Sequence, residues 1–206
     1  TAIKGVLISH TPFFMAPIMT IYYQYYASPV GQLLLLAKAE GLIAIEFAEE
    51  QATTDINTFM PASQTSGQIL EIFCKTPEIL DRYFQGEIID FSQLDFLAPQ
   101  GSSFQQAVWQ ILRQIPYGAT TSYGEIANQL GKPKAMRAVG GAVGRNPISI
   151  LIPCHRVLGK NQSLTGFGGG LPSKRYLLEL EGISYRNQGI EYVNPKTKKW
   201  LSLIHI

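Results

Sequence analysis

Residues 134–157 read KAMRAVGGAVGRNPISILIPCHRV. The first nine of these are mostly small residues and include a single arginine, Arg137. Pro133, directly before them, suits the first turn of a helix. Asn146-Pro147 should end that helix, because proline cannot continue it. The apolar run 148–152 is typical of a buried strand, which we expect to lead to Cys154.

A second short helix is expected just before this one. Ser122 and Glu125 have the spacing of a capping box, so a helix should run from there to Leu130, and Gly131 provides a C-terminal cap. Two short helices joined through a glycine form a helix-turn-helix pattern. By itself this pattern is only weak evidence for DNA binding, since many helical hairpins bind nothing.

Two further helices flank this region. Residues 102–115 carry apolar side chains on one helical face, and Pro172 begins a helix that runs to Glu181 and ends at Gly182. The segment 166–170 between Cys154 and the last helix is almost all glycine, with Phe167 in it. Such a segment either cradles a ligand or forms a flexible turn.

The first half of the chain has a different pattern. Apolar runs at 22–26, 33–37 and 42–47, separated by turns, predict a small antiparallel meander. Apolar residues at 69–84 then predict a helix, with Pro77 as a candidate break. We therefore expect a two-domain α/β protein: an N-terminal α/β domain at 19–98 and a C-terminal helix-turn-helix domain at 99–185, with a non-native or disordered extension at 1–18 and a tail at 186–206.

Charge is divided between the two halves. Residues 1–100 carry 4 Lys+Arg and 11 Asp+Glu, whereas residues 101–206 carry 13 and 4, so a net charge of −7 is followed by one of +9. A basic half suggests contact with a polyanion, although a solvated basic surface explains the charge equally well. No apolar run reaches about 18 residues, so we expect no membrane span.

The two cysteines, Cys74 and Cys154, lie in different settings and are not expected to pair, which favours a reducing compartment. Cys154 precedes His155-Arg156, where the histidine can accept the thiol proton and Arg156 and Arg145 can supply positive potential. The competing interpretation is a buried, inert cysteine. The chain has no CxxC and no Cys/His cluster, so no metal site is expected.

Together, the segment 134–142, Asn146-Pro147 and the run ILIPCHRV at 150–157 resemble the O6-alkylguanine-DNA alkyltransferases, from about Ser102 to Gly182. The resemblance implies an N-terminal domain of ribonuclease-H-like type and a C-terminal winged-helix-like domain that binds the minor groove of duplex DNA. It also implies base flipping and irreversible transfer of an alkyl group from O6 of guanine, or O4 of thymine, to Cys154.

The resemblance assigns roles to further residues. His155 takes the thiol proton through a water and Glu181 holds His155, while Tyr123 protonates the leaving base and Asn146 is a hinge. The residues expected at DNA are Arg137, which fills the space left in the duplex, with Ala135, Ala138, Gly140, Tyr123 and Arg145. Those expected at the flipped base are Val157, Phe167, Gly168 and Gly169.

Phe167 and Gly168 depart from many relatives, which carry Tyr and Ser there, so one hydrogen-bond donor is lost and room is added. We expect a monomer without cofactor, acting once per molecule, cytoplasmic or, in a eukaryote, nuclear. The alternatives are an alkyltransferase-like protein that binds lesions without transfer, a helix-turn-helix regulator and a Cys–His hydrolase. The first normally lacks the cysteine, and no oxyanion hole supports the last.

Overall fold

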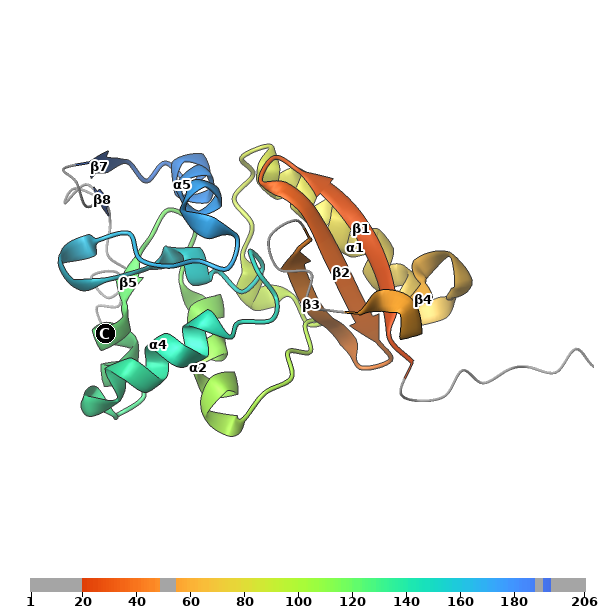
Figure 1. Ribbon diagram of the computed structural model, residues 1–206, viewed down its shortest axis with the longest axis horizontal. Coiled ribbons are helices and arrows are strands. Elements are labelled where there is room, and N and C mark those ends of the chain that lie inside the picture. The colour runs from red at the N-terminus through yellow and green to blue at the C-terminus, as the bar shows by residue number, and fades with distance from the viewer. Residues whose placement is uncertain (1–19, 49–54, 188–190, 194–206) are drawn as a thin grey trace, which may run out of the picture.

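The computed structural model describes residues 20–48, 55–187 and 191–193. A sheet domain formed by the first half of the chain lies beside a helical domain formed by the second half (Figure 1). The two-domain α/β organisation predicted from the sequence is therefore confirmed. The extension expected at 1–18 lies outside the described residues.

The N-terminal domain is built on the predicted antiparallel meander. Strands β1 (Tyr22–Ser28), β2 (Gly31–Lys38) and β3 (Gly41–Phe47) pair in sequence order, and the short β4 (Met60–Pro61) adds parallel to β1, giving the order β3-β2-β1-β4. Gly41 begins β3 with φ of 141°, and a Cβ there would lie 2.3 Å from the carbonyl oxygen of Phe96. Only glycine fits this approach between the sheet and the chain that leaves the domain.

Helix α1 (Gly67–Phe84) covers one face of this sheet (Figure 1). Its buried side chains, which include Ile72, Phe73 and Leu80, join the alternate inward residues of the strands in one core cluster. The helix is continuous through Pro77, so the break considered there does not occur. Packing on the sheet outweighs the one backbone hydrogen bond that proline removes.

The segment between the domains is tightly held. A short 3-10 turn, η3 (Phe91–Gln93), precedes residues 96–98, which bond to the free edge of β3 through Leu42. The Arg113 guanidinium donates to the carbonyls of Ser92 and Leu94 at 3.2 and 2.6 Å. Residues 91–98 therefore form a packed connection between the two domains.

The C-terminal domain begins with three helices in the predicted order. These are α2 (Ser103–Gln114), α3 (Tyr123–Gln129) and α4 (Met136–Gly144), the last preceded by the 3-10 turn η4 (Pro133–Ala135). The capping box of Ser122 and Glu125 is formed, and Gly131 has φ of 66° at the turn between α3 and α4. The predicted helix-turn-helix is thus confirmed.

The rest of the domain consists of short elements and one longer helix. They are β5 (Thr121–Ser122), η5 (Cys154–Arg156), β6 (Val157–Leu158), η6 (Lys160–Gln162), α5 (Gly170–Leu180), β7 (Tyr185–Asn187) and β8 (Glu191–Val193). Strand β5 pairs parallel with β6, and β7 pairs antiparallel with β8 at the start of the predicted tail 186–206. The other residues of that tail lie outside the described ones.

The prediction of a strand at 148–152 was wrong. Only Ile148 makes a strand-like bridge, to Ile45 of β3, and the chain then turns, with Ile152 N–H donating to the Ile148 carbonyl at 3.0 Å. Ile150 has φ of 73°, a strained conformation for a β-branched residue. The run is apolar because it is buried in the core, and burial alone does not distinguish a strand from a coiled segment.

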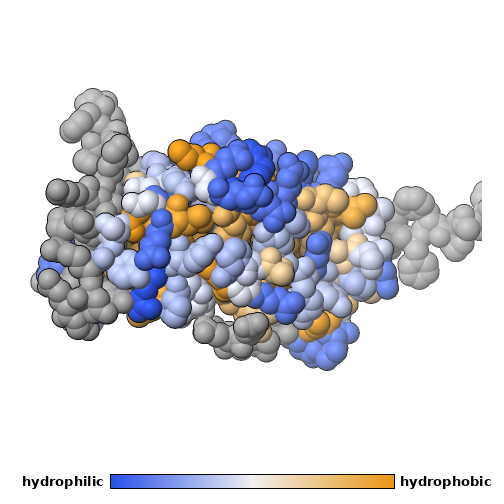
Figure 2. Space-filling model, turned by 90° about the horizontal axis from the view of Figure 1, so that it is seen from above, coloured by the Kyte–Doolittle hydropathy of each residue, from blue (hydrophilic) through white to orange (hydrophobic). Residues whose placement is uncertain are grey.

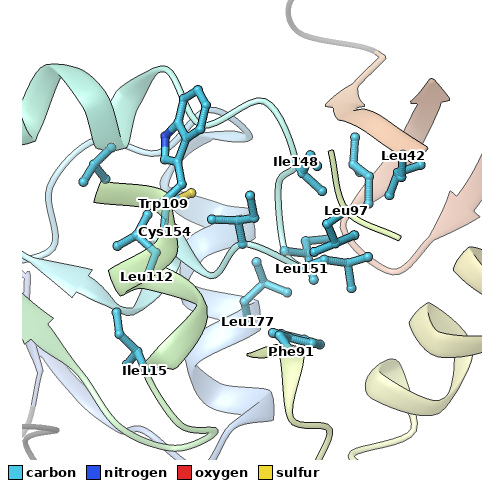
Figure 3. Close-up of a cluster of buried hydrophobic side chains, with 14 of the residues drawn as sticks. Leu42, Phe91, Leu97, Trp109, Leu112, Ile115, Ile148, Leu151, Cys154 and Leu177 are labelled. Carbon is cyan, nitrogen blue, oxygen red and sulfur yellow. The ribbon is translucent and has the colours of Figure 1, made fainter. Parts of the chain in front are cut away.

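One hydrophobic core extends through both domains. Figure 3 shows Leu42, Leu97 and Ile148 on one side of it and Trp109, Leu112 and Cys154 on the other. At the surface, hydrophobic and hydrophilic residues are interspersed on the face seen in Figure 2. Within the described ranges, no helix is long and apolar enough to cross a membrane.

Candidate active site

Cys154 is the first residue of the turn η5 and lines a pocket of about 290 Å³. The pocket wall comes from α3, α4, the turn before Cys154 and the glycine-rich loop. It brings together six predicted site residues: Tyr123, Gly140, Asn146, Cys154, Phe167 and Gly168. Cys154 is only 9% exposed as a residue, but it lines this pocket and is not sealed in the core.

Asn146 fixes both the thiol and the turn that carries it. Its side-chain amide donates to Cys154 Sγ at 3.1 Å and to the Ile152 carbonyl at 2.7 Å, while its oxygen accepts from Ile148 N–H at 3.1 Å. The asparagine lies two residues beyond the end of α4, so it links the helix-turn-helix to the cysteine. This arrangement replaces the strand that the sequence predicted between them.

The environment keeps the cysteine protonated until a base acts on it. Burial raises the pKa of Cys154, and the Asn146 hydrogen bond and the charge of Lys174 oppose that rise only in part. Because a thiolate attacks far better than a thiol, a nearby proton acceptor is required.

His155 has the state that a proton acceptor needs. It is fully buried, and burial lowers its pKa although Glu181 opposes the shift, so the imidazole is neutral near pH 7. Its Nε2 lies 2.9 Å from Glu181 Oε1, and an ionised carboxylate only accepts, so Nε2 carries the proton. Nδ1 is then a lone-pair acceptor, and it is buried without a hydrogen-bond partner in the described part of the chain.

Glu181 is the centre of a buried polar network. Burial alone would raise the pKa of this carboxyl, but the adjacent His155 and Arg156 lower it to about 2. Arg156 donates to it from Nε at 3.0 and 3.1 Å and from a terminal nitrogen at 2.8 Å, and Gly118 N–H donates at 3.2 Å. The predicted contact between Glu181 and His155 is therefore present, although the two residues are 26 positions apart in sequence.

The glycine-rich loop is positioned by the sheet domain. Phe167 packs edge-on against Phe47 of β3, with ring centroids 5.6 Å apart, and against His155 at 6.3 Å. A Cβ on Gly169 would lie 2.4 Å from the Phe47 ring. Gly169 is buried behind the pocket wall, and so is Val157, whose carbonyl accepts from Lys174 at 2.7 Å.

The outer face of α4 carries the residues expected at DNA. Arg137 and Ala138 are exposed, and Ala135 and Gly140 are half-buried. Arg137 borders two hollows: one of about 860 Å³ that also meets Tyr123, and one of about 540 Å³ shared with Arg145. The helix thus presents small residues and one projecting guanidinium beside the mouth of the cysteine pocket.

Two family models cover most of the chain. The 6-O-methylguanine DNA methyltransferase ribonuclease-like domain matches residues 21–98, and the DNA binding domain of the same family matches 103–183. A methylated-DNA–protein-cysteine methyltransferase of Haemophilus influenzae is 50% identical over 177 residues, which are 85% of this chain and 94% of that protein. This chain belongs to the 6-O-methylguanine DNA methyltransferase family. The family predicted from the segment around Cys154 is confirmed.

Other members of the family agree. The methyltransferase of Methanosarcina acetivorans is 44% identical over 162 residues, 79% of this chain and 99% of that protein. The crystal structure of the Mycobacterium tuberculosis O6-methylguanine methyltransferase in complex with DNA is 42% identical, with a TM-score of 0.68 over 78% of this chain and 93% of that one. The predicted transferase class is confirmed, and the lesion-binding alternative without transfer is not favoured.

Two buried polar residues of this methyltransferase site were missed by sequence reasoning. Lys174 on α5 is 1% exposed and donates to the carbonyls of Val157 and Thr165 at 2.7 and 3.1 Å, and burial lowers its pKa to about 8. Tyr83 on α1 donates to Glu181 at 2.7 Å. A lysine in an amphipathic helix predicts an exposed side chain, and a tyrosine predicts core packing, so neither pattern signals a site.

Cys74 and Cys154 are both free, as expected. Across residues 20–48, 55–187 and 191–193, no group of three or more His, Cys, Asp or Glu side chains is arranged to hold a metal ion.

Proposed function

We propose that Cys154 accepts an alkyl group from O6 of guanine, and from O4 of thymine, in duplex DNA. The observation that carries this proposal is the combination of a pocket-facing thiol held by Asn146 with a neutral, buried His155 next to it in sequence. A buried, inert cysteine would require neither. This chain covers nearly the full length of two relatives named methylated-DNA–protein-cysteine methyltransferases, and those names support the same reaction.

The proposed chemistry is a displacement at carbon. The thiol proton passes through a water to His155 Nδ1, and Glu181 stabilises the imidazolium that forms. The thiolate forms a bond to the alkyl carbon as the carbon–O6 bond breaks. Tyr123, whose hydroxyl lies 3.1 Å from that of Thr165, protonates the leaving guanine at N3. The product is a thioether, so each molecule acts once and no cofactor is needed.

The proposed docking uses α4 in the minor groove, where Ala135, Ala138 and Gly140 permit close approach. The target base leaves the stack and enters the Cys154 pocket, and Arg137 fills the vacated space. Arg145 adds a phosphate contact from the end of the same helix. Two exposed basic residues, Arg137 and Arg145, thus lie on the surface proposed to meet DNA.

The base pocket is proposed to hold guanine against Phe167. The backbone carbonyls of Cys154 and Val157 are proposed to accept from the exocyclic amine, the Val157 carbonyl through the lone pair that Lys174 does not use. A Cβ on Gly168 would meet nothing within 4 Å, so the pocket is open at that point. Gly169 is proposed to contribute indirectly, because its lack of a side chain lets the loop pack against Phe47. We place the protein as a monomer in the reducing compartment that holds DNA, the cytoplasm or a eukaryotic nucleus.

Stoichiometry tests this function. Protein is mixed with excess duplex DNA carrying isotope-labelled O6-methylguanine, and label on the protein is counted over time. We expect a plateau near one methyl group per molecule, and Cys154→Ser should bind the same duplex without acquiring label. Continued turnover, or label on the serine variant, is the result that excludes the proposal.

A further inference from the structure

Tyr83 brings a hydroxyl from the sheet domain into the Glu181 network. The residue lies in the last turn of α1 and is 0% exposed. Its hydroxyl donates to Glu181 Oε1 at 2.7 Å and lies 3.4 Å from His155 Nε2. The oxygen that accepts from Tyr83 is therefore the same one that accepts from His155.

The Tyr83 hydroxyl is held in this place. Its ring packs against Phe84, Phe91 and Tyr117, with centroids 5.5, 5.4 and 6.2 Å away. Burial, followed by the charge of Glu181, raises the pKa of Tyr83 well above its usual value, so the phenol remains a donor. Core packing alone would require the ring and not the hydroxyl, since phenylalanine supplies the same apolar contacts.

Tyr117 provides the contrasting case in the same cluster. Its hydroxyl donates at 2.7 Å to the carbonyl of Leu180, the residue before Glu181. That bond satisfies a half-buried phenol through the backbone and does not involve the carboxylate. Of these two neighbouring tyrosines, Tyr83 is fully buried and its hydroxyl donates to Glu181, whereas Tyr117 is half-buried and its hydroxyl donates to the backbone.

We propose that Tyr83 is a positioning residue for alkyl transfer, whose hydroxyl orients Glu181 and, through it, His155. This inference rests on the proposed function, in which His155 accepts the thiol proton. The N-terminal domain then takes part in the chemistry, although none of its residues that the structure describes lines the pocket around Cys154.

The direction of the effect follows from the shared oxygen. Each donor to Glu181 Oε1 withdraws negative charge from it, so Tyr83 weakens the support that the carboxylate gives to a protonated His155. Without the hydroxyl, the pKa of His155 should therefore be higher. More of the imidazole is then already protonated in acid and cannot accept the thiol proton. The other titratable or charged groups facing this pair come from η5, α5 and the turn after α2, and they are Cys154, Arg156, Lys174 and Tyr117.

The test compares Tyr83→Phe with Tyr117→Phe as the matched control. Single-turnover transfer from free O6-benzylguanine is followed across the acid-to-neutral pH range, which separates the chemistry from DNA binding. We expect the acid limb of the Tyr83→Phe profile to move to higher pH by about one unit, an approximately tenfold slower rate in acid. The Tyr117→Phe profile should coincide with that of the unmodified protein.

A second variant covers the case in which Tyr83→Phe does not fold. Fluorotyrosine at position 83 keeps the shape and strengthens the donor, so its acid limb should move in the opposite direction, to lower pH. Coincident profiles for the position-83 variants and the unmodified protein overturn the inference. That result differs from failure of the proposed function, in which the unmodified protein itself transfers nothing to Cys154.

Discussion

At the scale of single residues, Glu181 is the side chain on which the buried network depends. It accepts from His155, Arg156, Tyr83 and Gly118 and has almost no contact with water. The two positively polarised partners lower the pKa of Glu181 to about 2 from its ordinary 4.5, so ionisation of this carboxyl stabilises the fold. The free-energy cost of burying the Glu181 charge is offset only while every hydrogen-bond partner is in place.

We predict that Glu181→Gln lowers the free energy of unfolding at neutral pH by about 3–5 kcal/mol, because it leaves the Arg156 charge buried without its counter-charge. Since the folded pKa is depressed, the contribution of Glu181 is complete above about pH 4.5 and is lost as pH falls towards 2. Denaturant unfolding at a series of pH values checks this. Equal acid sensitivity in the variant and the unmodified protein would contradict it.

At the scale of secondary-structure elements, α4 and the glycine-rich loop have separate tasks. Helix α4 presents Arg137 outward, while the loop closes over the pocket with Phe167 and is supported from behind by Phe47. The helix should therefore affect reaction with DNA alone, and the loop should affect the stability of the site.

Arg137→Ala is predicted to slow transfer from duplex DNA by roughly tenfold or more, about 1.4 kcal/mol of lost interaction. Reaction with free O6-benzylguanine should be almost unchanged, because that base needs no flipping. Added salt should weaken duplex binding and leave the free-base rate nearly constant. Transfer rates measured in parallel on the two substrates test this prediction. Equal losses of rate on both would show that Arg137 does not act through contact of α4 with DNA.

Gly169 and Gly168 provide a matched pair for the loop. A methyl group at Gly169 meets the Phe47 ring, so Gly169→Ala should lower the free energy of unfolding by about 1–3 kcal/mol. Gly168→Ala adds the same group where nothing lies within 4 Å and should change stability by less than about 0.5 kcal/mol. Thermal or denaturant unfolding of the two variants suffices, and equal losses would show that Phe47 does not set the loop.

At the scale of the whole molecule, sequence patterns predicted the elements well and their contacts less well. Strand alternation, the Ser122 capping box and Gly131 act locally, so the meander and the helix-turn-helix could be predicted. The turn at 148–152 could not, because its conformation depends on the Asn146 side chain and on the edge of β3. Long-range contacts of this kind leave no periodic signal.

The site divides in the same way. Cys154, His155, Asn146 and Arg137 lie within one segment of 19 residues, and the resemblance carried by that segment identified them. Lys174 and Tyr83 come from helices distant in sequence, and their role depends on burial that only the folded chain creates. The pairing of Glu181 with His155 was inferred from family resemblance and not from spacing.

Irreversible alkylation of Cys154 Sγ can be tested directly by peptide mass mapping. After reaction with duplex DNA carrying O6-methylguanine, the protein is digested and both cysteine peptides are weighed. We expect the Cys154 peptide to gain one methylene unit and the peptide of the exposed Cys74 to be unchanged. An unmodified Cys154 peptide, or a gain on Cys74 instead, would contradict it.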